Sequence, residues 1–512
     1  MKETFNFKSI RLMAYCLVVP GIFLFSSCTS SVDAPMIESP NEAAEDAPAI
    51  LLSVPDFEYE VMTRTSISTG MVFSWAEGDQ IGIYSGQGSV CNFSIHSIGE
   101  NASTATFDGG GFSLTSGSTY YAVFPYNGNA TDLTKVPVTY PTQRQTANDN
   151  TEHLGALDYM TSCAVAEAQN QASFAFKHVG AIMRFQLTLP EAGTYTKLTV
   201  TSLGDTKFTT EGTIDVSKHQ VATAESAAVP PSVSAVTTNS SMSLQLGAAD
   251  DSGITLESSN LTLIAYMMVA PIDLSSTSVS ICVYNNDGVP YSATIDEGKN
   301  LAAGKACNHV ATLTKHEYVD LDLPSGLLWA TCNIGATEAL DAGSYFAWGE
   351  TETKSTYDLV NYSFFKGKGL YNVYLKYVTD SRYGTVDNLS TLQSEDDAAS
   401  VNWGSPWRMP TSSEITELVE NCYWEYVNDN TSKYYKVSSK THTDKYILLP
   451  IVGYYSGSKN ASDSRVYYLS RSLSLDNNNN VYSLYLGTNN HELLNSTTRY
   501  YGNPVRPVLP KQ

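Results

Sequence analysis

The chain has few charged residues, and positive charge is especially scarce. Charged residues make up 16% of its 512 residues, and 52 acidic residues outnumber 30 lysines and arginines, which gives a formal net charge of −22. Nucleic acids and anionic lipids are bound by basic surfaces, so this composition argues against binding either of them by charge. Because 42% of the residues are hydrophobic, we expect a globular protein of about three domains.

Motifs of catalysis and metal binding are also missing. The sequence holds no Gly-x-Ser-x-Gly, no His-Glu-x-x-His and no phosphate-binding Gly-x-x-x-x-Gly-Lys-Ser/Thr. Its eight histidines are scattered, and none is paired at the spacing of a metal site. We therefore expect no enzyme activity, no cofactor and no metal ion.

Cysteines are few and widely spaced. They form neither a compact disulfide framework nor a Cys-x-x-Cys metal motif, and we interpret most of them as buried thiols. Cys332 with Cys422 is the pair that we single out as a candidate disulfide. The cysteines that follow Cys28 are Cys91, Cys163, Cys282, Cys307, Cys332 and Cys422.

A targeting segment opens the chain. Basic residues precede an apolar run over 12–25, which is too short for a membrane-spanning helix. The run ends in Leu24-Phe-Ser-Ser-Cys28, which resembles a bacterial lipobox and implies lipidation of Cys28 and anchoring in the outer membrane. The alternative is an ordinary secretory signal with an incidental cysteine. The Ser-, Ala-, Pro- and acid-rich residues 29–49 predict a flexible tether.

Residues 50–316 alternate apolar and polar side chains between turn signals, which predicts short β-strands and no long helix. Five motifs occur there in a fixed order: Arg64-Thr-Ser, Phe73-Ser-Trp-Ala-Glu-Gly-Asp79, Tyr120-Tyr-Ala-Val-Phe-Pro-Tyr126, Phe176-Lys-His-Val-Gly-Ala-Ile-Met-Arg-Phe185 and Leu301-Ala-Ala-Gly-Lys305. This order resembles the fimbrillin-like family of Bacteroidales surface lipoproteins. The resemblance implies two consecutive transthyretin-like β-sandwich lobes, over 50–190 and 191–316.

The same resemblance implies a mode of assembly. In that family a leading strand is released by proteolysis after an arginine, and a strand of another fimbrial subunit then pairs into the open groove. Arg64 follows the candidate strand 57–61 and is the first basic residue after Cys28, so it is the implied processing site. The alternative is an ordinary first strand followed by an exposed arginine. A free donor strand is not evident after Thr314, which favours a tip or accessory subunit.

Residues 317–512 differ in kind and carry five of the six tryptophans. The signature residues of this segment are Trp329, Cys332, Trp348, Trp403, Trp407, Arg408, Pro410 and Arg506. Their order, together with the glycines and a closing Val-Arg-Pro-Val, resembles the Fibrobacter succinogenes major paralogous domain. The resemblance implies an irregular α+β fold related to C-type-lectin-like and formylglycine-generating-enzyme-like domains.

The stretch from Trp403 to Leu418 predicts a helix in this segment, because Thr411 and Glu414 form a capping box before an apolar face. We interpret the tryptophans as core rather than as a ligand platform, and Arg408 and Arg506 as buried donors that hold loops. Tyrosines offer a better contact surface. The tyrosines expected to be exposed are Tyr454, Tyr455, Tyr467, Tyr468, Tyr500 and Tyr501.

Calcium is the one metal that the lectin-like relationship raises. Glu350, Asp396, Asp397 and Asn402 could supply oxygen ligands, but the sequence has no Asp-x-Asp-x-Asp-Gly loop. Acids at 395–397 are explained more simply as the start of a helix.

We therefore expect a surface-exposed fimbrillin-type lipoprotein, on the outer membrane or on a fimbria, that presents its final domain for adhesion. The alternative is a non-polymerising surface lipoprotein that binds glycans or host proteins.

Overall fold

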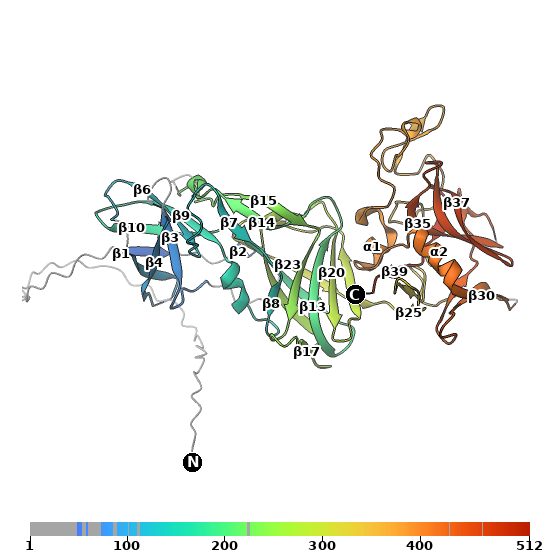
Figure 1. Cartoon of the computed structure of the whole chain (residues 1–512), viewed down its shortest axis with the longest axis horizontal. Coiled ribbons are helices and arrows are strands. Elements are labelled where there is room, and N and C mark those ends of the chain that lie inside the picture. Colours follow the sequence, from blue (N-terminus) through green and yellow to red (C-terminus); the bar gives the residue numbers. More distant parts are fainter. Residues whose placement is uncertain are drawn as a thin grey trace, which may run out of the picture. The chain divides into compact units, whose positions relative to one another are not determined.

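The computed structural model describes residues 49–53, 58–59, 73–84, 90–100, 102–109, 113–222, 226–429, 431–462 and 464–511. Residues from Ala47 to Gln512 form one compact unit. The fold is mainly β, with several sheets and few helices (Figure 1). Cys28, Arg64 and the tether up to residue 48 lie outside the described residues, so their predicted roles stay predictions.

An eight-stranded sheet forms the first lobe, in the order β10-β1-β5-β4-β3-β6-β9-β11. Its core gathers around Trp75, whose ring meets Phe107, Phe124 and Phe176 edge to face at centroid distances of 5.1, 5.4 and 6.0 Å. The strands are β1 Ala49–Ser53, β3 Gln80–Tyr84, β4 Val90–Ile98, β5 Thr104–Gly109, β6 Thr119–Phe124, β9 Met160–Val165, β10 Gln171–Ala175 and β11 Lys177–His178.

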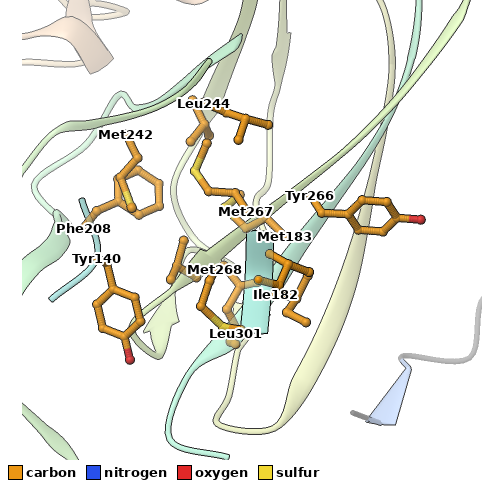
Figure 2. Close-up of a cluster of buried hydrophobic side chains, with 14 of the residues drawn as sticks. Tyr140, Ile182, Met183, Phe208, Met242, Leu244, Tyr266, Met267, Met268 and Leu301 are labelled. Carbon is orange, nitrogen blue, oxygen red and sulfur yellow. The ribbon is translucent and has the colours of Figure 1, made fainter. Parts of the chain in front are cut away.

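The second lobe combines a four-stranded sheet (β18-β12-β23-β2), a seven-stranded sheet (β24-β21-β20-β13-β16-β8, with β17 on β13), a three-stranded sheet (β15-β14-β7) and the pair β19-β22. Figure 2 shows part of its core, where buried methionines and aromatic residues meet. The elements are β2 Glu58–Tyr59, β7 Val136–Thr139, β8 Gln143–Gln145, η1 Glu152–Leu157, β12 Ala181–Thr188, β13 Gly193–Ser202, β14 Phe208–Ile214, η2 Val216–Lys218, β15 Val233–Asn239, β16 Ser241–Leu246, β17 Ile254–Leu256, β18 Thr262–Val269, β19 Ile272–Asp273, β20 Val279–Asn285, β21 Pro290–Ile295, β22 Asn300–Leu301, β23 Lys305–Thr312 and β24 Thr314–Lys315.

The division between the two lobes does not follow the predicted boundary at residue 190. Strands β7, β8 and β12 precede that boundary, yet they lie in the sheets of the second lobe. Buried side chains of β7 and β12, such as Val138 and Phe185, belong to the second core. Alternation along a strand shows that one face is buried, but it does not show against which sheet.

The final segment has short sheets, two α-helices and long connections, and it buries two large apolar clusters. Its elements are β25 Tyr318–Asp320, β26 Leu328–Ala330, β27 Tyr345–Phe346, β28 Phe365–Lys368, β29 Asn372–Tyr374, η3 Ser381–Tyr383, η4 Ser394–Asp396, α1 Ala398–Trp403, α2 Ser412–Asn421, β30 Cys422–Asn428, β31 Lys433–Ser439, β32 Tyr446–Pro450, β33 Tyr455–Ser456, β34 Lys459–Asn460, β35 Arg465–Leu473, β36 Asn480–Gly487, β37 Asn490–Thr498, β38 Asn503–Pro504 and β39 Val508–Leu509.

The end of α1 contacts strands β20 and β21 of the second lobe. The Ser292 hydroxyl donates to the carbonyl oxygen of Trp403 over 2.5 Å. Gly404 has a φ of +82°, and a Cβ there would lie 2.9 Å from the Ser280 Oγ, so the close approach requires glycine. The imidazole of His316 stacks on the Trp403 ring with a centroid distance of 3.8 Å. This contact joins the final segment to the second lobe.

The stacked His316 predicts a pH-dependent contribution to stability. Burial lowers the pKa of His316 to about 4 from its ordinary value of 6.5, so the folded protein favours the neutral ring. Stability from this group should be complete above pH 6.5 and should be lost as the pH falls toward 4. We expect the His316→Phe variant to lose less stability than the wild type between pH 6.5 and 4 in urea unfolding curves. Equal losses in both proteins would contradict this assignment.

Candidate functional site

Strand β1 lies between two strands that both depend on it for hydrogen bonds. It pairs in parallel with β10 and antiparallel with β5. Ile50 is in register with Ala172 and Phe107, and Leu52 is in register with Phe174 and Ala105. All four of these partner residues are buried in the core of the first lobe: Ala105, Phe107, Ala172 and Phe174. Without β1, the facing edges of β5 and β10 would lack main-chain partners beside this row of apolar residues.

Strand β2 belongs to the same leading part of the chain but contributes to another sheet. It pairs in parallel with β23, and it forms one edge of the four-stranded sheet. Both β1 and β2 precede residue 64 in the sequence. One cut after Arg64 would therefore separate both strands from the rest of the chain.

The strand that ends the second lobe is already occupied. β23 lies between β12 and β2 and is parallel to both, and β24 then pairs with β21. The chain continues directly into β25, which pairs with β26 of the final segment. Within residues 305–320, every strand that the structure describes is thus paired inside this chain.

Four tryptophans and one arginine of the final segment are buried. Trp329, Trp348, Trp403 and Trp407 are each at most 8% exposed. Arg506 is also buried and donates to the side chain of Asn333 and to the carbonyl oxygens of Ala330, Thr331 and Leu448 at 2.7–3.1 Å. These contacts tie the Arg506 segment to strands β26 and β32.

Helix α2 begins at the predicted capping box. The Glu414 N–H donates to the Thr411 hydroxyl, and the Thr411 N–H donates to the Glu414 carboxylate. Arg408 adds a bidentate ion pair to Glu414 at 2.6 and 2.7 Å. Burial opposes ionisation of this carboxyl, but the pair with Arg408 and the Thr411 N–H outweigh it and hold the pKa of Glu414 below its ordinary value. Pro410 directly precedes Thr411, where the helix starts.

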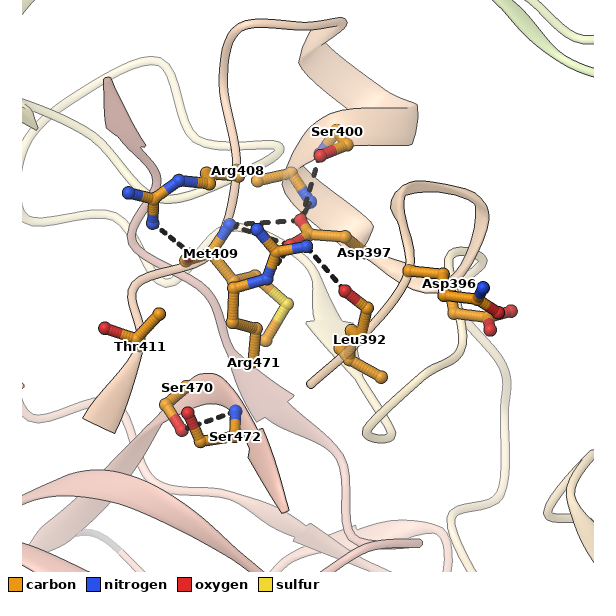
Figure 3. A network of polar contacts seen from close by, with 12 residues as sticks. Leu392, Asp396, Asp397, Ser400, Arg408, Met409, Thr411, Ser470, Arg471 and Ser472 are labelled. Atoms are coloured by element: carbon orange, nitrogen blue, oxygen red, sulfur yellow. Dashed lines mark hydrogen bonds and ion pairs between the residues drawn. The ribbon is translucent and has the colours of Figure 1, made fainter. Parts of the chain in front are cut away.

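Asp397 is the centre of a buried polar network (Figure 3). Its carboxylate accepts from the N–H groups of Ala399, Ser400 and Met409 at 3.0–3.1 Å. The Arg471 Nε lies 3.5 Å away, and Arg471 also donates to the carbonyl oxygen of Leu392. Asp397 thus caps α1 and ties it to the connection at Met409 that leads to α2. It has no oxygen free for a metal ligand, and the helix-start interpretation is confirmed.

The other residues considered for calcium are also engaged. Asn402 donates its amide to the Thr351 and Ala398 carbonyls, and Asp396 pairs with Lys376 at 2.7 Å. No cluster of three or more His, Cys, Asp or Glu side chains that could hold a metal occurs within the described ranges.

A pocket of about 330 Å³ opens beside these residues. Glu350 lies in its wall, where it accepts from the N–H and hydroxyl of Ser363 and pairs with Lys354 at 2.5 Å. The wall therefore combines carboxylates, a lysine and the Phe364 ring. The lining residues are Gly349, Glu350, Thr351, Glu352, Thr353, Lys354, Ser363, Phe364, Glu395 and Asp396.

Two expectations need correction. Cys332 and Cys422 are free thiols: the Cys332 Sγ contacts the carbonyl oxygen of Thr337, whereas Cys422 is buried with Ile415 and Leu418, so the two thiols occupy different surroundings. Tyr468 was expected to be exposed, but it is buried, with 2% of its surface accessible. Its side chain lies on the face of β35 that packs in the core. The other five tyrosines of that set are half-buried.

Arg499 is a structural residue that sequence reasoning missed. It is fully buried, and it donates to the Tyr362 hydroxyl and to the carbonyl oxygens of Lys376, Tyr377 and Asn478. Its guanidinium lies 4.2 Å from the centroid of the Tyr374 ring. A single arginine among polar residues carries no sequence pattern that marks it as buried.

Comparisons with known proteins place these features in context. A family model described as Fimbrillin-like matches residues 63–325, just over half of the chain. A candidate cell adhesion protein from Bacteroides ovatus is 17% identical and covers 54% of this chain and 97% of its own, with a TM-score of 0.33. A similar protein from Bacteroides uniformis is 16% identical and covers 54% of this chain and 95% of its own, with a TM-score of 0.33. A fimbrial protein from Bacteroides ovatus is 12% identical and covers 91% of this chain and 100% of its own, with a TM-score of 0.25.

No curated protein matches the chain. In the part of the chain that the structure describes, no helix is both long enough and apolar enough to cross a membrane.

The Asp397 network predicts a large loss of stability on truncation. Asp397→Ala leaves three buried N–H groups and Arg471 without their acceptor, so we expect a loss of about 3–5 kcal/mol. Glu395→Ala is the matched control; it removes one half-exposed ion pair with Lys376 and should cost less than about 1 kcal/mol. Urea unfolding followed by tryptophan fluorescence suits this test, since five of the six tryptophans lie in the final segment. Similar losses in both variants would contradict the central role of Asp397.

Proposed function

Because this chain belongs to the fimbrillin-like family, we propose that it is a cell-surface fimbrial tip or accessory subunit that accepts a strand from a neighbouring subunit. Its final segment would be presented for adhesion. The family comprises fimbrial and adhesion proteins and not enzymes, which confirms the expectation that the chain is non-enzymatic.

The observation that supports this proposal most is the position of β1 between β5 and β10. A strand between β5 and β10 is held by main-chain hydrogen bonds on both sides, and main-chain bonds can be replaced by those of any extended segment. The apolar partners in register with Ile50 and Leu52 would select a donor with alternating apolar residues. Release of β2 would expose the edge of β23 as well, so the acceptor site would extend over two sheets.

The pairing of β23 supports the capping role. A subunit that polymerises must also offer a strand to the next subunit, and the described strands between 305 and 320 are all paired within this chain. A subunit that accepts without donating ends a polymer. This proposal places the final segment at the exposed end of an assembly.

The final segment is proposed as the recognition part. It resembles the major paralogous domain, whose lectin-like fold presents loops on a fixed scaffold, and it holds the pocket beside Glu350. The buried tryptophans and arginines leave the loops as the surface that can contact a glycan or a host protein. Lipidation of Cys28 would hold the protein in the outer membrane until it is assembled.

Cleavage after Arg64 should convert the protein into a strand acceptor. After brief trypsin treatment of residues 47–512, we expect mass spectrometry to show a chain that starts at Thr65. The cleaved chain should bind a synthetic peptide of residues 47–61, whereas the uncleaved chain should not. The Arg64→Gln variant is the matched control and should remain uncleaved and unable to bind.

A peptide carrying Ile50→Lys and Leu52→Lys tests the register, because two lysines opposite buried Phe107 and Phe174 should reduce the affinity by at least about 100-fold. Equal binding of both peptides, or equal binding by cleaved and uncleaved chains, would overturn strand acceptance. A solitary surface protein would then be the better description.

If the final segment binds a ligand in the pocket beside Glu350, a bulky side chain at the pocket wall should weaken that binding. Thr351→Trp places a large ring at the pocket wall, so binding of a pocket ligand in a glycan and matrix-protein array should fall at least about tenfold. Thr441→Trp, at an exposed turn outside the pocket, should leave binding unchanged. Array binding that survives Thr351→Trp would place the contact elsewhere on the final segment.

A further inference from the structure

A hairpin of the final segment exposes an apolar tip. Strands β28 and β29 are joined by Gly369-Leu370-Tyr371, and the hairpin lies in the amber part of the chain in Figure 1. Leu370 is 99% exposed, the highest value among the exposed large apolar side chains, and Tyr371 is 41% exposed. Water contact over a whole leucine side chain is unfavourable by about 1.5–3 kcal/mol relative to burial. The tip is therefore suited to an apolar environment outside the protein.

The hairpin itself carries positive charge. Residues 365–374 contain two lysines and neither Asp nor Glu, in a chain with a net charge of −22. Lys366 and Lys368 are exposed on β28, directly before the tip. Arg382 lies over the Tyr371 ring at 5.4 Å and pairs with Asp380. The hairpin is thus a local cationic feature on an acidic protein.

The base of the hairpin is fixed. Tyr374 is 1% exposed, and its hydroxyl donates to the Asn479 side chain at 2.9 Å. Asn372 donates to the same side-chain oxygen at 3.0 Å. Tyr371 also packs on the Tyr383 ring, with a centroid distance of 5.3 Å. The tip is consequently held in place and does not need to fold when it meets a partner.

We propose that this hairpin inserts its tip into the surface of an anionic lipid membrane. Leu370 would enter the acyl boundary, Tyr371 would lie at the level of the headgroups, and Lys366 and Lys368 would face lipid phosphates. The proposal goes beyond strand acceptance and does not depend on it.

The small size of the tip favours a membrane over a protein partner. A stable protein interface buries about 1,200 Å² or more of complementary surface, and three residues at the end of a two-stranded hairpin do not supply that area. A lipid surface requires no complementary shape, because each inserted apolar side chain and each lysine adds its own contribution.

The acidic character of the whole chain does not prevent this contact. Salt screens charges over about 8 Å at physiological ionic strength, so a lipid surface that meets the tip interacts first with Lys366 and Lys368. Charge alone would be insufficient, and the exposed leucine supplies the apolar part of the binding. Both parts are needed, which makes the proposal testable on each separately.

The test is co-sedimentation of residues 47–512 with phosphatidylcholine vesicles that contain phosphatidylglycerol, and with phosphatidylcholine vesicles alone. We expect binding to the anionic vesicles, about tenfold weaker binding by Leu370→Ser, and a similar reduction for Lys366→Gln with Lys368→Gln. Leu475→Ser is the matched control, since Leu475 is a 62% exposed leucine in another turn, and it should bind like the wild type. Raising the salt concentration should weaken the wild type and leave the double glutamine variant less affected.

Three results would overturn the proposal. One is the absence of binding to anionic vesicles at any concentration tested. A second is binding that Leu370→Ser does not reduce. The third is lysine-dependent binding to soluble heparin that equals the vesicle binding and ignores Leu370, which would assign the hairpin to acidic glycans instead. Circular dichroism of each variant would show whether the fold is retained.

Discussion

The first lobe depends on the hydrogen bonds that β1 makes to both of its neighbours. Polar main-chain groups cannot remain unpaired next to a buried apolar row, and β5 and β10 have no other strand between them. Five residues at the start of the described chain therefore complete an eight-stranded sheet. Because they come from the leading end of the chain, their place can in principle be filled by a segment of another molecule. The proposed function follows from this one constraint.

The final segment is stabilised in another way, because its long connections have few main-chain hydrogen bonds to neighbouring strands. Buried side chains take over that role: Asp397 accepts from three N–H groups, and Arg499 and Arg506 each donate to several carbonyl oxygens. Each of these groups is inside a closed network, in which removing one partner leaves several others unsatisfied. The scaffold is consequently held by contacts that depend on one another.

Local features were predictable from the sequence, and long-range ones were not. The capping box at Thr411 and Glu414 involves residues three apart, so its chemistry is visible in the sequence, and the buried tryptophans follow from their size. The position of β12 in the second lobe and the burial of Arg499 depend on partners far away in the chain. The predicted pairing of Cys332 with Cys422 failed for the same reason, because spacing does not show which thiols meet. Membership of the family was predictable from the order of several motifs.

The direction of β23 has a mechanical consequence. This strand runs parallel to β12 through seven register positions, from Ile182–Ala306 to Thr188–Thr312, and the chain leaves its end toward the final segment. Between β23 and the final segment the chain also forms β24, which pairs with β21 of another sheet. Tension applied to the final segment would therefore be carried by the ladder of β24 and β21 before it reached β23.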